Sequence, residues 1–135
     1  MDRQSKNLFP NTHKRTNNLL SGEHLIELVE IKEGAPRRFD RDKEPRPCIV
    51  FKFRTDSGEP VIRTVTATTD ARGRCVELVR QMAGANQPTE RDLESGESLT
   101  QFILGLVGKK FQATLEPSSN GRYNNIVSIR QASGR

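Results

Sequence analysis

Residues 108–130 read GKKFQATLEPSSNGRYNNIVSIR, which is the pattern of two short strands joined by a turn. The pair Asn120-Gly121 readily takes the positive φ values that tight hairpin turns need, so the stretch predicts a β-hairpin. Arg122 and Tyr123, the single tyrosine of the chain, follow that turn directly. Because other strands and a helix are predicted upstream, we interpret the hairpin as the closing pair of strands of a small barrel.

The first predicted strand covers residues 23–33, which are dense in aliphatic and β-branched side chains and are bounded by Gly22 and Gly34. A helix is the competing interpretation, since some of these apolar residues also fit a helical spacing. Residues 34–47 contain three prolines and alternating charges. They predict a long loop, and loops of this length are often functional.

Two further strands are predicted at 48–54 and 60–68, joined by a turn at 56–59. The first of them alternates apolar and polar side chains, so its two faces differ. One face carries Ile49, Phe51 and Phe53, and the other carries Val50, Lys52 and Arg54. We expect the phenylalanines to lie in the core.

The period then changes to that of a helix over residues 72–85, with Asp70 as its N-cap and Gly84 as its C-terminal stop. A second short helix is predicted at 98–107, ended by Gly108. The apolar face of the first helix comprises Cys75, Leu78, Val79, Met82 and Ala83.

This order of elements, three strands, one or two helices and two strands, predicts a mainly β fold and is that of a five-stranded OB-fold-like barrel. An α+β sheet with the same order is the alternative. The domain is expected to span residues 22–131. Residues 1–21 are polar and basic and predict a disordered arm, residues 86–97 predict an irregular acidic connection, and residues 132–135 a frayed end.

The charge of the chain predicts an anionic partner. The formal net charge is +5. The length of 135 residues allows one domain with a single core. The charge is uneven, because residues 87–97 hold four acids (Glu90, Asp92, Glu94 and Glu97) against Arg91. Such a segment is either a solvated surface or a docking site for a protein partner.

Catalytic, metal and membrane functions find no support in the sequence. Neither His13 nor His24 is paired with a nucleophile, and no glycine-rich phosphate motif occurs, so we expect no enzyme and no cofactor. Cys48 and Cys75 are too few for a disulfide framework or a zinc site and are expected to be buried thiols. The absence of a long apolar run and of a signal peptide predicts a cytoplasmic protein that does not contact membranes.

Single-stranded nucleic acid is bound by cations that follow the phosphates and by aromatic faces on which bases stack. In OB-folds the ligand lies over strands two and three, between the loop that joins strands one and two and the loop that joins strands four and five. The residues that fit this scheme are Arg37, Arg38, Phe39 and Arg41 in the first loop, Lys52, Arg54 and Arg63 on strands two and three, and Arg122 and Tyr123 beside the last turn.

Other interpretations of these residues stay open. Lys52 and Arg54 also fit the solvated side of a strand, and Tyr123 fits packing against the hairpin as well as base stacking. Aromatic residues make up only 5% of the chain, which argues against a dedicated binder of high affinity. The alternative function is a protein-interaction module on the same fold, which uses the acidic segment 90–97 and the proline-rich loop.

Several segments also carry a family resemblance. They are GEHLIELVEIKEG at 22–34, FKF at 51–53, QMAG at 81–84, LVGKKF at 106–111 and GRYNNI at 121–126. With these the chain resembles small single-stranded-DNA-binding-like OB-fold proteins of phages, plasmids and bacterial mobile elements, over roughly residues 22–130. The resemblance implies binding of single-stranded nucleic acid with little sequence preference, with DNA favoured over RNA, in replication or recombination. It does not extend to the acidic tail of cellular single-strand binders, since residues 129–135 are basic.

Overall fold

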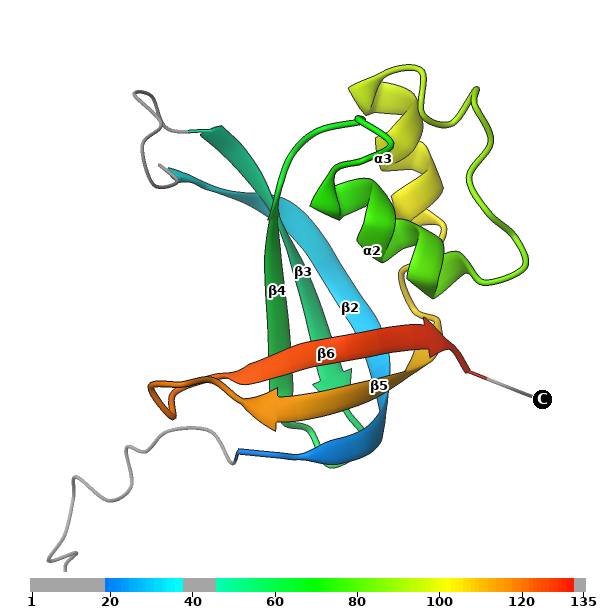
Figure 1. Cartoon of the computed structure of the whole chain (residues 1–135). Coiled ribbons are helices and arrows are strands. Elements are labelled where there is room, and N and C mark those ends of the chain that lie inside the picture. Colours follow the sequence, from blue (N-terminus) through cyan, green and yellow to red (C-terminus); the bar gives the residue numbers. More distant parts are fainter. Residues whose placement is uncertain (1–18, 38–45, 133–135) are drawn as a thin grey trace, which may run out of the picture.

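The computed structural model describes residues 19–37 and 46–132, which form five strands and two helices (Figure 1). The strands are β2 (Gly22–Arg37), β3 (Arg46–Thr55), β4 (Pro60–Thr66), β5 (Lys110–Pro117) and β6 (Asn124–Gln131). The helices α2 (Arg74–Ala83) and α3 (Gly96–Leu104) lie between β4 and β5 in the chain. The predicted order of elements and the mainly β class are therefore confirmed.

All five described strands belong to one antiparallel sheet with the order β4-β3-β2-β5-β6. The long, bent strand β2 pairs with both β3 and β5, so the two halves of the sheet turn around it (Figure 1). The edge strands of the sheet, β4 and β6, approach one another but do not pair along a ladder, and α2 packs against both. The sheet is thus open between β4 and β6.

Strand β2 forms where the sequence left a helix as the alternative, and it extends beyond the predicted end at residue 33. Arg37 still pairs with Arg46, so the ends of the predicted loop 34–47 belong to β2 and β3, and residues 38–45 lie outside the described part. The predicted arm at 1–21 likewise falls outside it up to residue 18, and the predicted frayed end falls outside it from residue 133.

Both helices begin at other residues than predicted. The N-cap of α2 is Gly73, which has no capping side chain, whereas Asp70 accepts a hydrogen bond at Oδ1 from the Arg72 amide at 2.9 Å. Gly84, with φ of 60°, ends α2 as predicted. Helix α3 begins two residues before the predicted start because Ser95 and Ser98 form a capping box.

Helix α3 also ends earlier than predicted. Its C-cap is Gly105, whereas Gly108, the predicted stop, lies in the connection to β5 with a φ of 91°. Because α3 begins at Gly96, the acidic connection ends at Ser95, before the predicted end at residue 97.

Three phenylalanine rings form the centre of the core. Phe51 and Phe53 stack at 6.5 Å between centroids, and Phe111 of β5 meets Phe53 edge-on at 6.4 Å. Their burial confirms the predicted inward face of β3. Both cysteines are buried free thiols, as predicted, and burial raises the pKa of the Cys75 thiol to about 11.

Candidate nucleic-acid interface

The face of β2, β3 and β4 that points away from the phenylalanines is called here the outer face. The register places Lys52 between Glu30 and Ile62, and Arg54 between Glu27 and Pro60. Lys52 and Arg54 therefore lie on this face, on the side of β3 that the alternation of the sequence predicted, and Arg54 is exposed.

Two glutamates balance the cations of the outer face. Glu30 Oε1 lies 3.7 Å from Lys52 Nζ, and Glu27 is the register partner of Arg54. Residues three apart in a regular strand point to opposite faces, but a bulge between Leu28 and Glu30 brings both glutamates to the same one. This mixed charge was not predictable from the sequence, because a bulge leaves no clear signal in the pattern.

Arg63 does not share the outer face with Lys52 and Arg54. It lies directly opposite Phe51, and residues opposite one another in an antiparallel pair point to the same side, which here is the inner one. The expected grouping of three cations on the hairpin is thus wrong in its placement of Arg63. Its Nη1 instead donates a hydrogen bond at 3.3 Å to the carbonyl oxygen of Ile126 on β6.

The connection between β5 and β6 spans residues 118–123 and carries Arg122 and Tyr123, both exposed. Ser118 Oγ accepts hydrogen bonds from the amides of both residues, and Gly121 has the predicted positive φ, at 71°. The Tyr123 side chain is packed against little, since 56% of the residue is exposed.

Asn124, which follows this connection, attaches it to the far edge of the sheet. Its Oδ1 accepts a hydrogen bond from the Leu20 amide at 2.8 Å, and its Nδ2 donates one at 3.5 Å to the carbonyl of Pro60, the first residue of β4. Asn124 is buried, with only 3% exposed. The sequence offered no signal for this role, because an Asn after a turn normally indicates only the turn.

The predicted loop 34–47 contributes few described residues to the candidate interface. Arg37 ends β2 and pairs through its backbone with Arg46, whereas Arg38, Phe39 and Arg41 lie outside the described residues. The described part therefore brings Lys52 and Arg54 together on the outer face and holds the connection with Arg122 and Tyr123 beside the start of β4.

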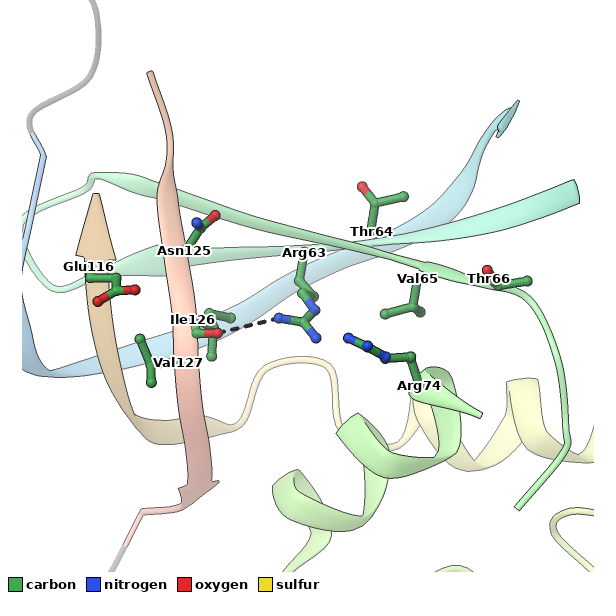
Figure 2. A pocket seen from close by; sticks show the side chains of 9 residues that line it. All are labelled: Arg63, Thr64, Val65, Thr66, Arg74, Glu116, Asn125, Ile126 and Val127. Carbon is green, nitrogen blue, oxygen red and sulfur yellow. Dashed lines mark hydrogen bonds between the residues drawn. The ribbon is translucent and has the colours of Figure 1, made fainter. Parts of the chain in front are cut away.

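A cleft lies between the open edges β4 and β6 and the start of α2, with a volume of about 700 Å³ (Figure 2). We call it the arginine cleft, because Arg63 and Arg74 extend into it with their guanidinium groups pointing toward one another. Arg74 was not predictable from the sequence as a site residue, since its approach to Arg63 depends on the packing of α2 across the sheet edges.

Other kinds of site find no support in the described residues. They contain no group of three or more His, Cys, Asp or Glu side chains that could hold a metal ion. Among the helices in the described ranges, none is both long and apolar enough to cross a membrane. Comparisons with protein-family models and with curated proteins find no match to this chain.

Proposed function

We propose that this chain is an OB-fold-like domain that binds single-stranded nucleic acid with little sequence preference, with DNA favoured over RNA, and that it does so without catalysing a reaction. The open side of the sheet between β4 and β6 fits an OB-fold, which is a partly open five-stranded barrel. The predicted resemblance to the single-strand binders of mobile elements is part of this proposal, and so is their cytoplasmic role in replication or recombination.

One observation carries the proposal. The hydrogen bond from Asn124 to the Pro60 carbonyl holds the exposed Arg122 and Tyr123 beside β4, whose first residue is the register partner of Arg54. Figure 1 agrees, since the connection between β5 and β6 projects past the edge strand β4. A strand of nucleic acid that crosses β3 and β4 would therefore meet cations on the sheet and an aromatic ring at its edge.

The mixed charge of the outer face sets the expected affinity. Glu30 and Glu27 offset part of the attraction that Lys52 and Arg54 offer to phosphates, so the binding is expected to be weak, and it should weaken further as salt is added. If about three or four phosphates are neutralised, log K falls with log salt at a slope of about −2 to −3.

The test is fluorescence anisotropy of the full chain with a labelled oligo-dT at two salt concentrations. The double variant K52Q/R54Q should weaken binding and flatten the salt slope, whereas E27Q/E30Q should bind more tightly. Arg80→Gln is the matched control, because this arginine is exposed on α2, away from the outer face. Absence of binding at low salt, or equal binding by K52Q/R54Q, contradicts the proposal.

Tyr123 tests the stacking contribution separately. A stacked base contributes about 1–3 kcal/mol, so Tyr123→Ala should weaken oligo-dT binding at least fivefold. Tyr123→Phe keeps the ring and should bind within about twofold of the original chain. Equal affinities for the Ala and Phe variants would remove Tyr123 from the interface.

A second candidate function is a protein-interaction module that uses the acidic segment 90–97. The observation that favours it is that Glu90, Glu94 and Glu97 are all exposed and have no ion pair within the described part of the chain. Binding of a basic peptide that is lost in the triple variant to Gln, together with no binding of oligo-dT, favours this function over the first.

A further inference from the structure

We propose that the arginine cleft is a phosphate site, in which the guanidinium groups of Arg63 and Arg74 bind one phosphate group from two sides. The site is distinct from the outer face, because Arg63 lies on the inner side of the sheet and Arg74 is the first residue of α2. It does not depend on the function proposed above.

Arg63 is held in place through its side chain, and Arg74 is held through the backbone of α2. Arg63 is half-buried, and its hydrogen bond to the Ile126 carbonyl fixes one end of the guanidinium at the edge of β6. Arg74 belongs to a helix whose next two residues, Cys75 and Val76, are fully buried. The Arg74 side chain is itself exposed, so the fold fixes its backbone position, and its guanidinium group faces that of Arg63 (Figure 2).

The two facing guanidinium groups have no neutralising partner within the described residues. Neither Arg63 nor Arg74 has a carboxylate oxygen within 4.0 Å there, whereas Lys52, Lys110 and Arg130 each form an ion pair. Two facing guanidinium groups repel one another, and the positive end of the α2 dipole adds to the potential. An anion between them removes this repulsion.

The donors and the nearby acidic residues of the cleft favour one kind of anion. Guanidinium groups present planar pairs of N–H donors, which match the oxygens of a phosphate in bidentate geometry. Glu116 lines the cleft near β6 and Glu77 lines its continuation along α2, so a single small anion fits better than a run of several charges. The same chemistry is offered by free phosphate and by one phosphodiester of a nucleic acid.

The site is tested by NMR of the ¹⁵N-labelled full chain, titrated with sodium phosphate at constant ionic strength and, in parallel, with sodium chloride. We expect saturable shifts of the Arg63 and Arg74 Nε–H signals with phosphate only. Arg74→Gln should weaken phosphate binding at least fivefold, and the control Arg80→Gln should change it less than twofold. Shifts that do not saturate, or that chloride reproduces, overturn the proposal.

Two further arms sharpen the result. Glu77→Gln and Glu116→Gln remove negative charge beside the cleft, so each should tighten phosphate binding about twofold or more, and weaker binding would contradict the proposal. Repeating the phosphate titration with saturating oligo-dT identifies the source of the ligand. Suppressed shifts indicate a phosphodiester in the cleft, whereas unchanged shifts indicate a free phosphate.

The outcomes separate the two proposals. Saturable phosphate shifts without any oligo-dT binding support the phosphate site and contradict the nucleic-acid function. Binding of oligo-dT without saturable phosphate shifts supports the nucleic-acid function and contradicts the phosphate site.

Discussion

Arg63 donates a hydrogen bond from Nη1 to the backbone carbonyl of Ile126 at 3.3 Å, and this bond connects the two edge strands of an otherwise open sheet. No ladder joins β4 to β6 in the described residues, so side chains hold the edges together. Asn124 does the same at the start of β4 through its bond to Pro60. The approach of the two edge strands thus depends on two side chains as well as on α2.

Arg63→Met should therefore destabilise the fold. The variant keeps much of the aliphatic stem but loses the charged donor, and a net cost of about 1 kcal/mol in the free energy of unfolding is expected. Arg74→Met is the matched control, since within the described residues its guanidinium makes no hydrogen bond, and its removal relieves repulsion. Urea denaturation followed by circular dichroism measures both, and equal stabilities of the two variants would contradict the role of Arg63.

Arg63 illustrates which features of the fold could be predicted from the sequence and which could not. The alternation of 48–54 and the helical period of α2 depend on neighbouring residues, so their inward faces were predicted correctly. The register of β3 against β4 depends on the length of the hairpin connection. A shift of one residue would have moved Arg63 to the side of Lys52, and composition does not decide between the two registers.

The candidate site was harder to predict than the fold for the same reason. The mixed charge of the outer face depends on a bulge at Val29, and the arginine cleft depends on the packing of α2 against β4 and β6. Both are tertiary features that bring together residues without a shared local pattern. Arg122 and Tyr123 were predictable as turn neighbours, but their attachment to β4 depends on Asn124.

The three phenylalanine rings predict a core that is sensitive to ring loss. Phe53 contacts both Phe51 and Phe111, so Phe53→Leu should lower the free energy of unfolding by about 1–2 kcal/mol through lost ring contacts and imperfect packing. Tyr123→Leu removes an exposed ring and should change stability by less than about 0.5 kcal/mol. Chemical denaturation of both variants checks the contrast, which similar losses would contradict.

Gly84 is expected to tolerate no side chain. Its φ of 60° and ψ of −119° are a conformation that L-residues rarely adopt, and an added Cβ would lie 3.1 Å from the Cβ of Gln131. Gly84→Ala should lower the free energy of unfolding by about 1 kcal/mol or more. Gly96→Ala, at the start of α3 with open space around its Cα, should be neutral or stabilising. Thermal melts of both variants decide the point, and a neutral Gly84→Ala would contradict it.

Glu23 should titrate below the ordinary range of a glutamate. The hydrogen bond from Arg130 at 3.2 Å, followed by that from the Thr114 hydroxyl at 3.1 Å, lowers the pKa of its carboxyl group. The lowered pKa means that this pair stabilises the fold above the unfolded pKa, near 4.3, and that the contribution is lost as the pH falls through the folded pKa.

Carbon-detected NMR titration of the Glu23 carboxyl group measures this pKa directly. Arg130→Gln should raise the pKa of Glu23 toward the ordinary value, whereas Arg80→Gln should leave it unchanged. A Glu23 pKa that does not respond to the loss of Arg130 would show that the contact is absent in solution.

Cys75 should make the fold less stable at alkaline pH. Burial raises the pKa of its thiol to about 11, whereas an unfolded cysteine titrates near 8.5, so above that pH the unfolded state loses its proton first. The free energy of unfolding then falls between the two pKa values, by about 1 kcal/mol at pH 9.5.

Because Cys48 is present in both proteins, comparing the original chain with Cys75→Ala isolates the Cys75 thiol. The variant should be less stable at pH 7.5 because of the cavity, but it should lose less stability between pH 7.5 and 9.5. Parallel pH profiles of the two proteins would contradict the assignment.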